Sequence, residues 1–136
     1  MAKQFTLGKK ERLKSRKAID QLFSNGQRMS VFPYRIFYLF EKREATEAAL
    51  QCGVGVSARN FKKAVDRNRI KRLTREGYRL QKAALDTKMK AQSRKLSFFL
   101  IYTGKELPAF LVVKETLALV LQKMIKIADE NTAADT

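Results

Sequence analysis

The sequence predicts one α+β domain in which helices pack on a single β-sheet. Its 136 residues suit one domain, and no long linker divides them, so we expect that domain to span residues 1–136. Apolar residues make up 45% of the chain, which is enough for one modest core. The predicted elements follow the order helix, strands, helix, strand, helix, which is typical of an α+β sandwich.

A short helix is predicted near the N-terminus. Residues 1–10 are expected to form a flexible basic arm ahead of it. Over residues 15–25, apolar side chains such as Ile19 and Phe23 recur on one helical face. Gly26 then ends the helix.

Three strands are predicted between that helix and the next one. A short strand covers residues 27–31, and residues 34–41 form a strand of high β-propensity with aromatic side chains on both faces. Residues 50–57 alternate in polarity and form the third strand. Gly53 and Gly55 lie on one face of it and leave space there for a backbone or a ligand.

The second half of the chain is predicted to hold two helices around a fourth strand. Residues 60–84 form the main helix, and residues 85–95 form a polar connection. Residues 96–102 form the strand, residues 110–128 form a final amphipathic helix, and residues 129–136 form a polar, frayed tail. The main helix has an apolar stripe at spacings of three and four residues: Ile70, Leu73, Gly77, Leu80 and Ala84.

The charge of the chain indicates a polyanionic partner. It has 29 Lys and Arg against 13 Asp and Glu, a net charge of +16. Residues 1–28 hold 8 basic and 2 acidic side chains, residues 58–82 hold 10 and 2, and the segment between them is neutral. A lysine-rich solvated surface is the simpler interpretation, but the second block is rich in Arg, which matches phosphates and base edges better than Lys does. On charge alone the partner is a nucleic acid, an anionic membrane surface or an acidic protein.

Several classes of function are excluded by missing residue types. The chain has no His, so a Ser-His-Asp triad, a His general base and a His-bound metal are impossible. Cys52 is the single cysteine, so no disulfide forms within the chain, and a reducing compartment, the cytoplasm, is expected. No carboxylate motif for catalysis or metal binding occurs, so we predict no catalytic residue and no metal site. No apolar run reaches ~18 residues and no secretory signal begins the chain, so no membrane partner is expected.

The most informative segment runs from Ala64 to Arg75 and reads AVDRNRIKRLTR. A basic row on a helix that packs on a sheet can follow the phosphates of a nucleic acid. The amide of Asn68 can read a base edge, a 2′-hydroxyl or a bound water. A solvated helix face is the alternative, but few acidic residues are available for pairing. The row is spaced by four residues: Arg67, Lys71, Arg75 and Arg79.

These residues resemble the protein subunit of bacterial ribonuclease P. The run Arg67-Asn68-Arg69-Ile70-Lys71-Arg72 is similar to the RNR signature of that family. The resemblance extends to the segment before this helix and to the N-terminal helix, and covers roughly residues 6–127. It implies the element order αβββαβα, a mixed sheet with a left-handed βαβ crossover, and a domain like those of ribosomal proteins.

The resemblance also implies a function. The family's protein is a subunit of a ribonucleoprotein endonuclease, a hydrolase that removes the 5′ leader of precursor tRNA. The implied partners are therefore ribonuclease P RNA and precursor tRNA. The RNA and its Mg²⁺ ions perform the chemistry, and no cofactor is implied on the protein itself.

Two sets of site residues follow from the resemblance. Ile19 and Ala58 depart from the family pattern, which often has Phe and Lys at these positions. Both departures lower the expected affinity for the leader. Ordinary core packing is the alternative for Phe23 and Phe37. The implied contacts to the catalytic RNA are Arg67, Asn68, Arg69, Lys71, Arg72 and Arg75. The implied contacts to the leader, in a cleft between the first helix and the sheet, are Arg16, Ile19, Phe23, Phe37, Ser57 and Arg59.

Two other functions fit the charge. A ribosomal or RNA-chaperone protein would bind RNA without stimulating the cleavage of precursor tRNA. A duplex-DNA binder would use residues 60–84 as a recognition helix, but the chain lacks the helix-turn-helix pattern, because that helix follows a strand.

Overall fold

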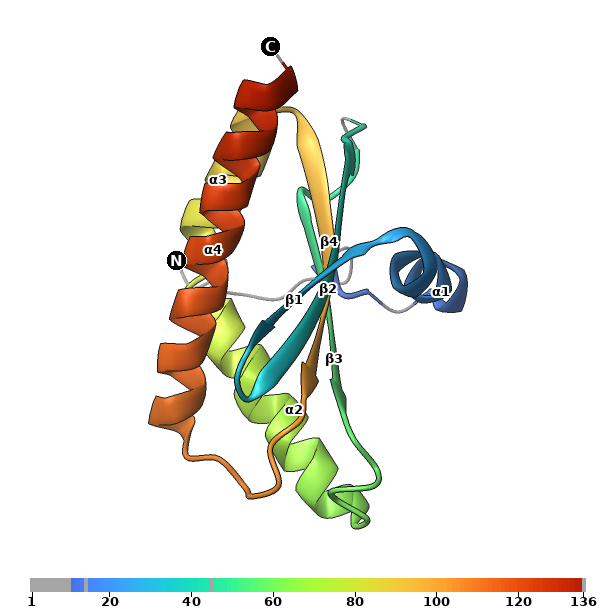
Figure 1. Ribbon diagram of the computed structural model, residues 1–136, viewed down its shortest axis with the longest axis vertical. Coiled ribbons are helices and arrows are strands. Elements are labelled where there is room, and N and C mark those ends of the chain that lie inside the picture. Colours follow the sequence, from blue (N-terminus) through green and yellow to red (C-terminus); the bar gives the residue numbers. More distant parts are fainter. Residues whose placement is uncertain (1–10, 14, 45, 136) are drawn as a thin grey trace.

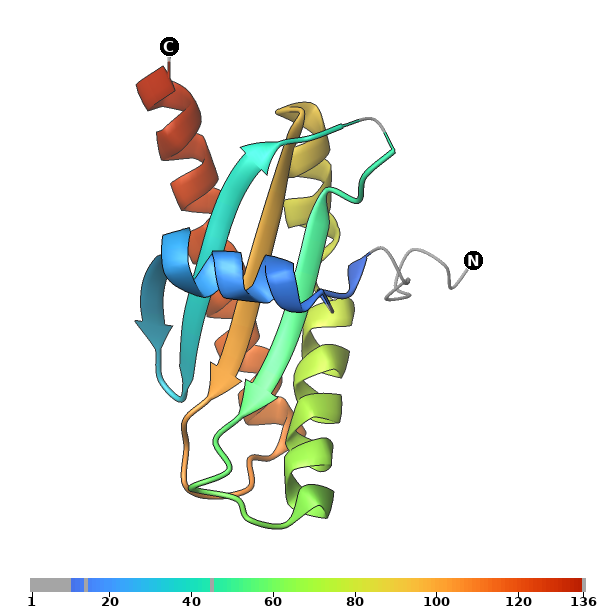
Figure 2. The ribbon, with the colours of Figure 1, turned by 90° about the vertical axis from the view of Figure 1, so that its right-hand side faces the viewer.

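The computed structural model places a four-stranded sheet between two helical layers (Figure 1). It describes residues 11–13, 15–44 and 46–135, with side chains as far as Glu130. The helices are α1 (Arg16–Asn25), α2 (Ala64–Arg79), α3 (Ala83–Ala91) and α4 (Phe110–Asp135). The strands are β1 (Gln27–Val31), β2 (Tyr34–Lys42), β3 (Leu50–Val56) and β4 (Arg94–Tyr102). Helix α1 lies on one face of the sheet and the other three helices lie on the opposite face (Figures 1 and 2), so the predicted α+β sandwich is confirmed.

The sheet is mixed, with the strand order β1-β2-β4-β3. Strand β2 is antiparallel to both β1 and β4, whereas β3 is parallel to β4. Helices α2 and α3 connect β3 to β4 behind the sheet in Figure 2, and that connection is left-handed. Almost all such connections are right-handed. The unusual crossover that the family resemblance implied is therefore present.

The core lies between the sheet and helices α2 to α4. Successive side chains of a strand point to opposite faces, so every second residue of β2 and β4 faces this layer. Burial of a large apolar side chain in this core stabilises the fold by about 1.5–3 kcal/mol. The strands supply the buried side chains Tyr34, Ile36, Tyr38, Leu96, Phe98 and Leu100, and α4 supplies Val113, Leu117, Val120 and Met124.

The predicted helix over residues 60–84 is two helices, and most of residues 85–95, predicted as a polar connection, belongs to α3 and to the start of β4. Helix α2 ends at Arg79, and a turn of three residues precedes α3. Two side chains of that turn make contacts far along the chain: the Gln81 amide donates to the Lys114 carbonyl at 3.0 Å, and Lys82 forms an ion pair with Glu11. These long-range contacts hold the turn between α2 and α3. The spacing of apolar residues along the sequence did not reveal it.

The stripe predicted for this helix is correct only in part. Ile70 and Gly77 are buried, but Leu80 is 36% exposed and Ala84 is exposed. The α2 side that faces the core instead contains Ile70, Thr74, Gly77 and Tyr78. Thr74 is acceptable there because its hydroxyl donates to the Ile70 carbonyl at 2.8 Å.

The chain ends differ from expectation as well. Residues 129–135 continue α4 and are not a frayed tail. Ala128 is buried in the core, and an ion pair of 2.6 Å joins Lys88 of α3 to Asp129 of α4, so α4 has tertiary contacts as far as Asp129. The predicted arm over residues 1–10 lies outside the described residues.

Candidate nucleic-acid interface

Helix α2 presents cations on the side away from the core. Burial of Ile70, Thr74 and Tyr78 against the sheet and α4 fixes the rotation of the helix about its axis. Arg67 and Lys71 are half-buried, and the other polar side chains of the signature are exposed. The exposed residues of the predicted RNA-contacting set are Asn68, Arg69, Arg72 and Arg75.

The two ends of the basic row make contacts within the protein. The Arg67 guanidinium donates to the carbonyls of Phe61 at 2.8 Å and Lys62 at 2.7 Å. It thereby fixes the loop that leads from β3 into α2. At the other end, Arg79 forms an ion pair with Glu76, one turn earlier, and the carboxylate raises the pKa of the Arg79 guanidinium. The sequence indicated the row but not these internal partners.

A cluster of three phenylalanine rings lies where α1 crosses the sheet. The ring centroids of Phe23 and Phe37 are 4.7 Å apart, and those of Phe23 and Phe99 are 5.3 Å apart in an edge-to-face arrangement. All three side chains are half-buried, so the cluster is neither a closed core nor fully solvated. The structure therefore brings together the two rings that the sequence singled out, and adds Phe99, which the sequence interpretation missed.

Gly53 and Gly55 make room for the Phe99 ring. A Cβ atom on Gly53 would lie 2.5 Å from Cδ2 of Phe99, and one on Gly55 would lie 2.9 Å from Cε1. Both are closer than side chains normally approach. The predicted clearance on β3 is present, and an aromatic ring of this protein occupies it.

Arg28 of β1 adds a cation to this cluster. Its guanidinium carbon lies 5.4 Å from the centroid of the Phe37 ring, within the range of a cation–π interaction. The sequence interpretation did not include Arg28. Arg28 lies opposite Phe37 in the β1–β2 register. That register could not be read from the sequence.

The remaining predicted leader contacts are spread along this face. Arg16 is exposed and Ile19 half-buried on α1, whereas Ser57 and Arg59 follow the end of β3. Helix α1 crosses the middle of the sheet, so the lower part of the face in Figure 2, toward the ends of β3 and β4, has no helix over it. An uncovered stretch of sheet therefore separates the aromatic cluster from Ser57 and Arg59.

Comparison with a family sequence model identifies the family of this chain. The sequence model of the family named Ribonuclease P matches residues 7–124, more than four-fifths of the chain. This chain belongs to the ribonuclease P protein family.

Individual members of the ribonuclease P family agree with the match. The ribonuclease P protein component of Porphyromonas gingivalis (strain ATCC 33277) is 35% identical over 126 residues, which cover 91% of this chain and 88% of that protein. The component of Nitrosococcus oceani is 34% identical over 83 residues, 61% of this chain and 66% of that protein.

Solved ribonuclease P proteins share the fold. The protein from Staphylococcus aureus aligns with a TM-score of 0.63 at 18% identity, over 84% of this chain and 94% of that one. The protein from Thermotoga maritima aligns with a TM-score of 0.65 at 22% identity, over 83% of this chain and 96% of that one. The family match and the relative from Porphyromonas gingivalis identify the chain as a ribonuclease P protein component, a subunit of an endoribonuclease.

The single cysteine of the chain is buried in the core. Burial raises the pKa of the Cys52 thiol far above its usual value, so this sulfur is not an available nucleophile. In the part of the chain that the structure describes, no three His, Cys, Asp or Glu side chains gather as metal ligands. Nor does any helix among these residues combine the length and the apolar character needed to span a membrane.

Proposed function

We propose that this protein binds the catalytic RNA of ribonuclease P and the 5′ leader of precursor tRNA, and so assists the removal of the leader. The product is the mature 5′ end of tRNA, and the site of action is the cytoplasm. The observation that carries the proposal is a pair of unlike surfaces: exposed cations on α2, and half-exposed aromatic rings where α1 crosses the opposite face of the sheet.

The exposed cations of α2 suit the catalytic RNA. They project from a helix whose rotation is fixed by buried side chains, so their spacing is set before RNA binds, and little order has to be gained on binding. Arg forks bind phosphates in bidentate fashion, and Asn68 between them can contact a base edge or a 2′-hydroxyl. The proposed contacts are Asn68, Arg69, Lys71, Arg72 and Arg75, with Arg67 completing the surface at the loop.

The aromatic cluster and the uncovered sheet beside it suit a single strand. Half-exposed rings such as Phe23 and Phe37 can stack on bases without strong sequence preference, as a leader that differs between tRNAs requires. Arg28 lies over Phe37 and can approach a phosphate of a base stacked there. From this cluster the strand would cross the uncovered part of the sheet toward Ser57 and Arg59.

The chemistry is assigned to the RNA. Hydrolysis of a phosphodiester needs an activated water and stabilisation of the leaving oxygen, for which nucleases commonly use metal ions. We propose that Mg²⁺ bound to the catalytic RNA supplies both, and that the protein increases the rate by binding and positioning the precursor. The protein then needs no metal or organic cofactor of its own.

The deciding experiment is cleavage of a precursor tRNA at low Mg²⁺ by a transcribed bacterial ribonuclease P RNA, with and without this protein. We expect a large gain in rate with correct 5′ ends. Arg72→Glu should reduce the gain in rate. Lys123→Glu, which reverses a charge in the same way at an exposed position of α4, should not. Salt-sensitive binding to unrelated RNAs without any gain would favour a ribosomal or RNA-chaperone role. Cleavage without the RNA subunit would overturn the assignment of the chemistry.

A further inference from the structure

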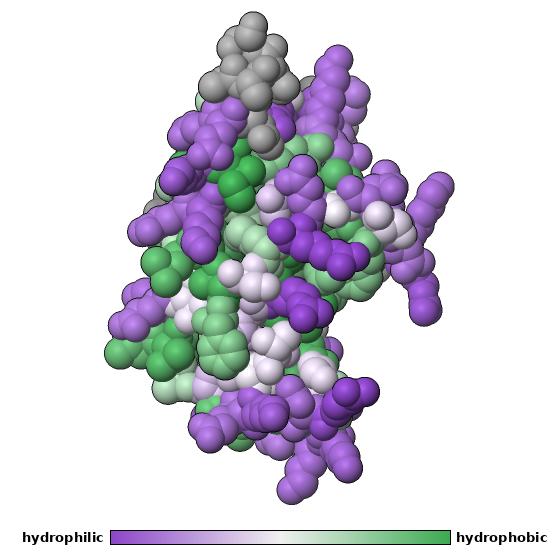
Figure 3. Space-filling model, viewed as in Figure 1, coloured by the Kyte–Doolittle hydropathy of each residue, from purple (hydrophilic) through white to green (hydrophobic). Residues whose placement is uncertain are grey.

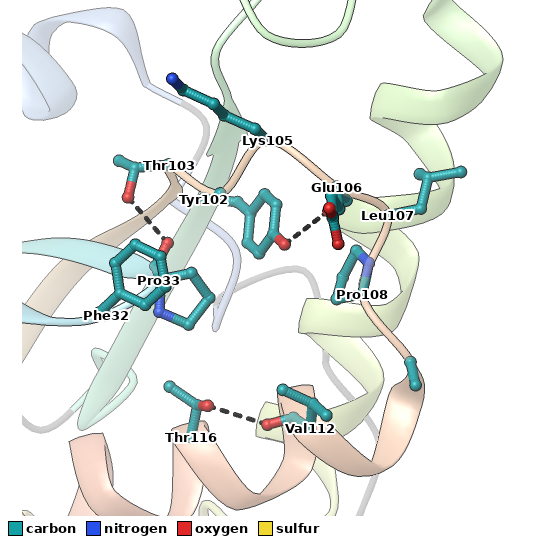
Figure 4. A pocket seen from close by; sticks show the side chains of 12 residues that line it. Phe32, Pro33, Tyr102, Thr103, Lys105, Glu106, Leu107, Pro108, Val112 and Thr116 are labelled. Atoms are coloured by element: carbon teal, nitrogen blue, oxygen red, sulfur yellow. Dashed lines mark hydrogen bonds between the residues drawn. The ribbon is translucent and has the colours of Figure 1, made fainter.

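A hollow of about 650 Å³ lies at the end of the molecule where α4 begins. Its walls come from the β1–β2 turn, the segment between β4 and α4, and the first turns of α4 (Figure 4). The volume falls within the range of about 300–1,000 Å³ that is usual for ligand sites. The main apolar lining residues are Phe32, Pro33, Leu107, Pro108 and Val112.

The hydroxyl groups within these walls already have partners. The Thr103 hydroxyl donates to the Pro33 carbonyl at 3.0 Å, and the Tyr102 hydroxyl donates to the Glu106 carbonyl at 2.7 Å. In α4, the Thr116 hydroxyl donates to the Val112 carbonyl at 2.9 Å. These bonds fix the walls and leave mainly apolar contact surface for an occupant.

Phe32 stands at this hollow as the most exposed large apolar side chain among the described residues. Its exposed fraction is 83%. Phe23 and Phe37 contact each other, but no such aromatic contact is found for the Phe32 ring within the described part of the chain. Single exposed apolar residues are common, but an aromatic ring beside an apolar hollow is a stacking surface that a planar group can use.

The charge around the hollow argues for a polyanionic occupant. Lys105 is exposed at its edge and points away from the apolar walls (Figure 4). The Asn60 amide donates to the carbonyls of Thr103 and Gly104 at 3.3 and 3.4 Å, which ties the wall of the hollow to the loop before α2. In Figure 3, hydrophilic side chains gather at the lower end of the molecule, next to the apolar area over the start of α4. The exposed lysines of that loop are Lys62 and Lys63.

We propose that the hollow receives one unstacked base of the catalytic RNA, which stacks on Phe32 while the phosphates on either side contact Lys105 and the cations of the loop before α2. The proposal rests on the proposed function and extends the α2 surface to this end of the molecule. Glu106 is exposed at the same edge, and its carboxylate can accept a hydrogen bond from an amino group of the base. An apolar protein segment would leave the surrounding cations without counter-charges.

Tryptophan fluorescence tests the proposal directly, because the chain contains no Trp. Phe32→Trp places the single fluorophore at the hollow, and Leu119→Trp, at an exposed position of α4 outside it, is the control. Addition of a transcribed bacterial ribonuclease P RNA should quench the emission of the first variant, because a stacked base quenches indole, and should leave the second nearly unchanged. An emission change that follows protein concentration without RNA would show that a second copy occupies the hollow, and would overturn the proposal.

Affinity measurements separate stacking from simple apolar contact. Phe32→Ala and Phe32→Leu should each weaken binding of the same RNA at least about fivefold, whereas Phe32→Tyr should bind like the unchanged protein. Equal binding by all variants, with no quenching at position 32, would overturn this inference while the proposed function stands. Failure of the unchanged protein to bind the RNA at all would instead overturn the proposed function.

Discussion

The ring of Phe99 occupies the space above Gly53, two positions that face each other in the β3–β4 register. The same ring contacts Phe23, which is how α1 is seated on the sheet. Gly53, which has no side chain, therefore leaves the space on β3 in which the aromatic cluster lies. The relation joins a feature of strand geometry to the surface that we assign to the leader.

Gly53→Ala should destabilise the protein, because the new methyl group would overlap the Phe99 ring. We expect a loss of about 1–3 kcal/mol in the free energy of unfolding, the usual cost of overpacking. Urea denaturation followed by circular dichroism measures it.

Gly55→Ala is the matched comparison for this prediction. Its Cβ would lie 2.9 Å from Phe99, against 2.5 Å at Gly53, and position 55 is half-exposed, so the ring can move more easily. We expect a smaller loss. Equal stabilities of both variants and the unchanged protein would show that the Phe99 ring is not fixed by this contact.

Phe23→Ala should lower the affinity for precursor tRNA much more than the affinity for mature tRNA. The ring is half-buried between Phe37 and Phe99, and its loss removes a stacking surface worth ~1–3 kcal/mol per base. Binding of both tRNAs to the assembled ribonucleoprotein at fixed salt measures the difference.

Phe110→Ala controls for the loss of a half-buried ring elsewhere, since Phe110 lies at the start of α4 and away from α1. It should leave the ratio of the two affinities unchanged. If Phe23→Ala weakens both tRNAs equally, or unfolds the protein, ordinary packing explains the ring and the leader assignment is wrong.

Arg72→Ala should weaken binding to the catalytic RNA by ~1–3 kcal/mol and reduce the slope of log affinity against log salt by about 1. Arg72 is exposed, so the free energy of unfolding should stay within about 0.5 kcal/mol of the unchanged protein. Filter binding over a range of salt concentrations and urea denaturation provide the two measurements. Unchanged affinity would remove this part of α2 from the interface.

Arg67→Ala should differ from Arg72→Ala in its effect on stability. The Arg67 guanidinium donates to two loop carbonyls, so its removal should cost about 1–2 kcal/mol of unfolding free energy in addition to any loss of RNA affinity. Arg67→Lys should recover part of the RNA affinity but not the paired hydrogen bonds. If both alanine variants unfold like the unchanged protein, the loop does not depend on Arg67.

The sequence predicted the strands well because their signal is local. Alternation along residues 34–41 and 50–57 identifies β2 and β3 within one residue at each end. The break between α2 and α3 was missed because it depends on Gln81 and Lys82, whose partners lie 33 and 71 residues away. A helical pattern that continues through such a turn contains no sign of it.

The site was predictable to the same degree. Phe23 and Phe37 were found from the resemblance, but Phe99 and Arg28 reach the cluster only through strand register, which the sequence leaves open. Arg67 was assigned to the catalytic RNA from the resemblance, whereas its guanidinium also bonds to the loop before α2. Residue type and spacing indicate the chemistry of a surface, and long-range pairing determines which side chains compose it.

Tyr34 should make the stability of the protein sensitive to alkaline pH. Burial raises the pKa of its phenol from 10.0 to about 12, against a smaller opposing effect of the hydrogen bond to Thr74. The two hydroxyls lie 2.6 Å apart. When the phenol ionises, the Thr74 hydroxyl can turn from the Ile70 carbonyl and donate to the phenolate, which is why this contact opposes the effect of burial. A raised pKa of an acid means that the protonated phenol stabilises the fold below pH 10, and that this contribution of roughly 2–3 kcal/mol is lost as pH rises toward 12.

Tyr34→Phe should therefore be about 1 kcal/mol less stable than the unchanged protein at pH 8, where it lacks the hydrogen bond, and should lose less stability between pH 10 and 12. Thr74→Val is the matched control, because it removes the same hydrogen bond but keeps the titrating phenol, so its alkaline loss should persist. Urea denaturation at intervals from pH 8 to 12 gives all three curves. Since Tyr78 is also buried with a raised pKa, the comparison is the difference between variants and not the total loss. Parallel curves for Tyr34→Phe and the unchanged protein would show that the Tyr34 phenol is accessible to water and that this end of the core is looser than the structure indicates.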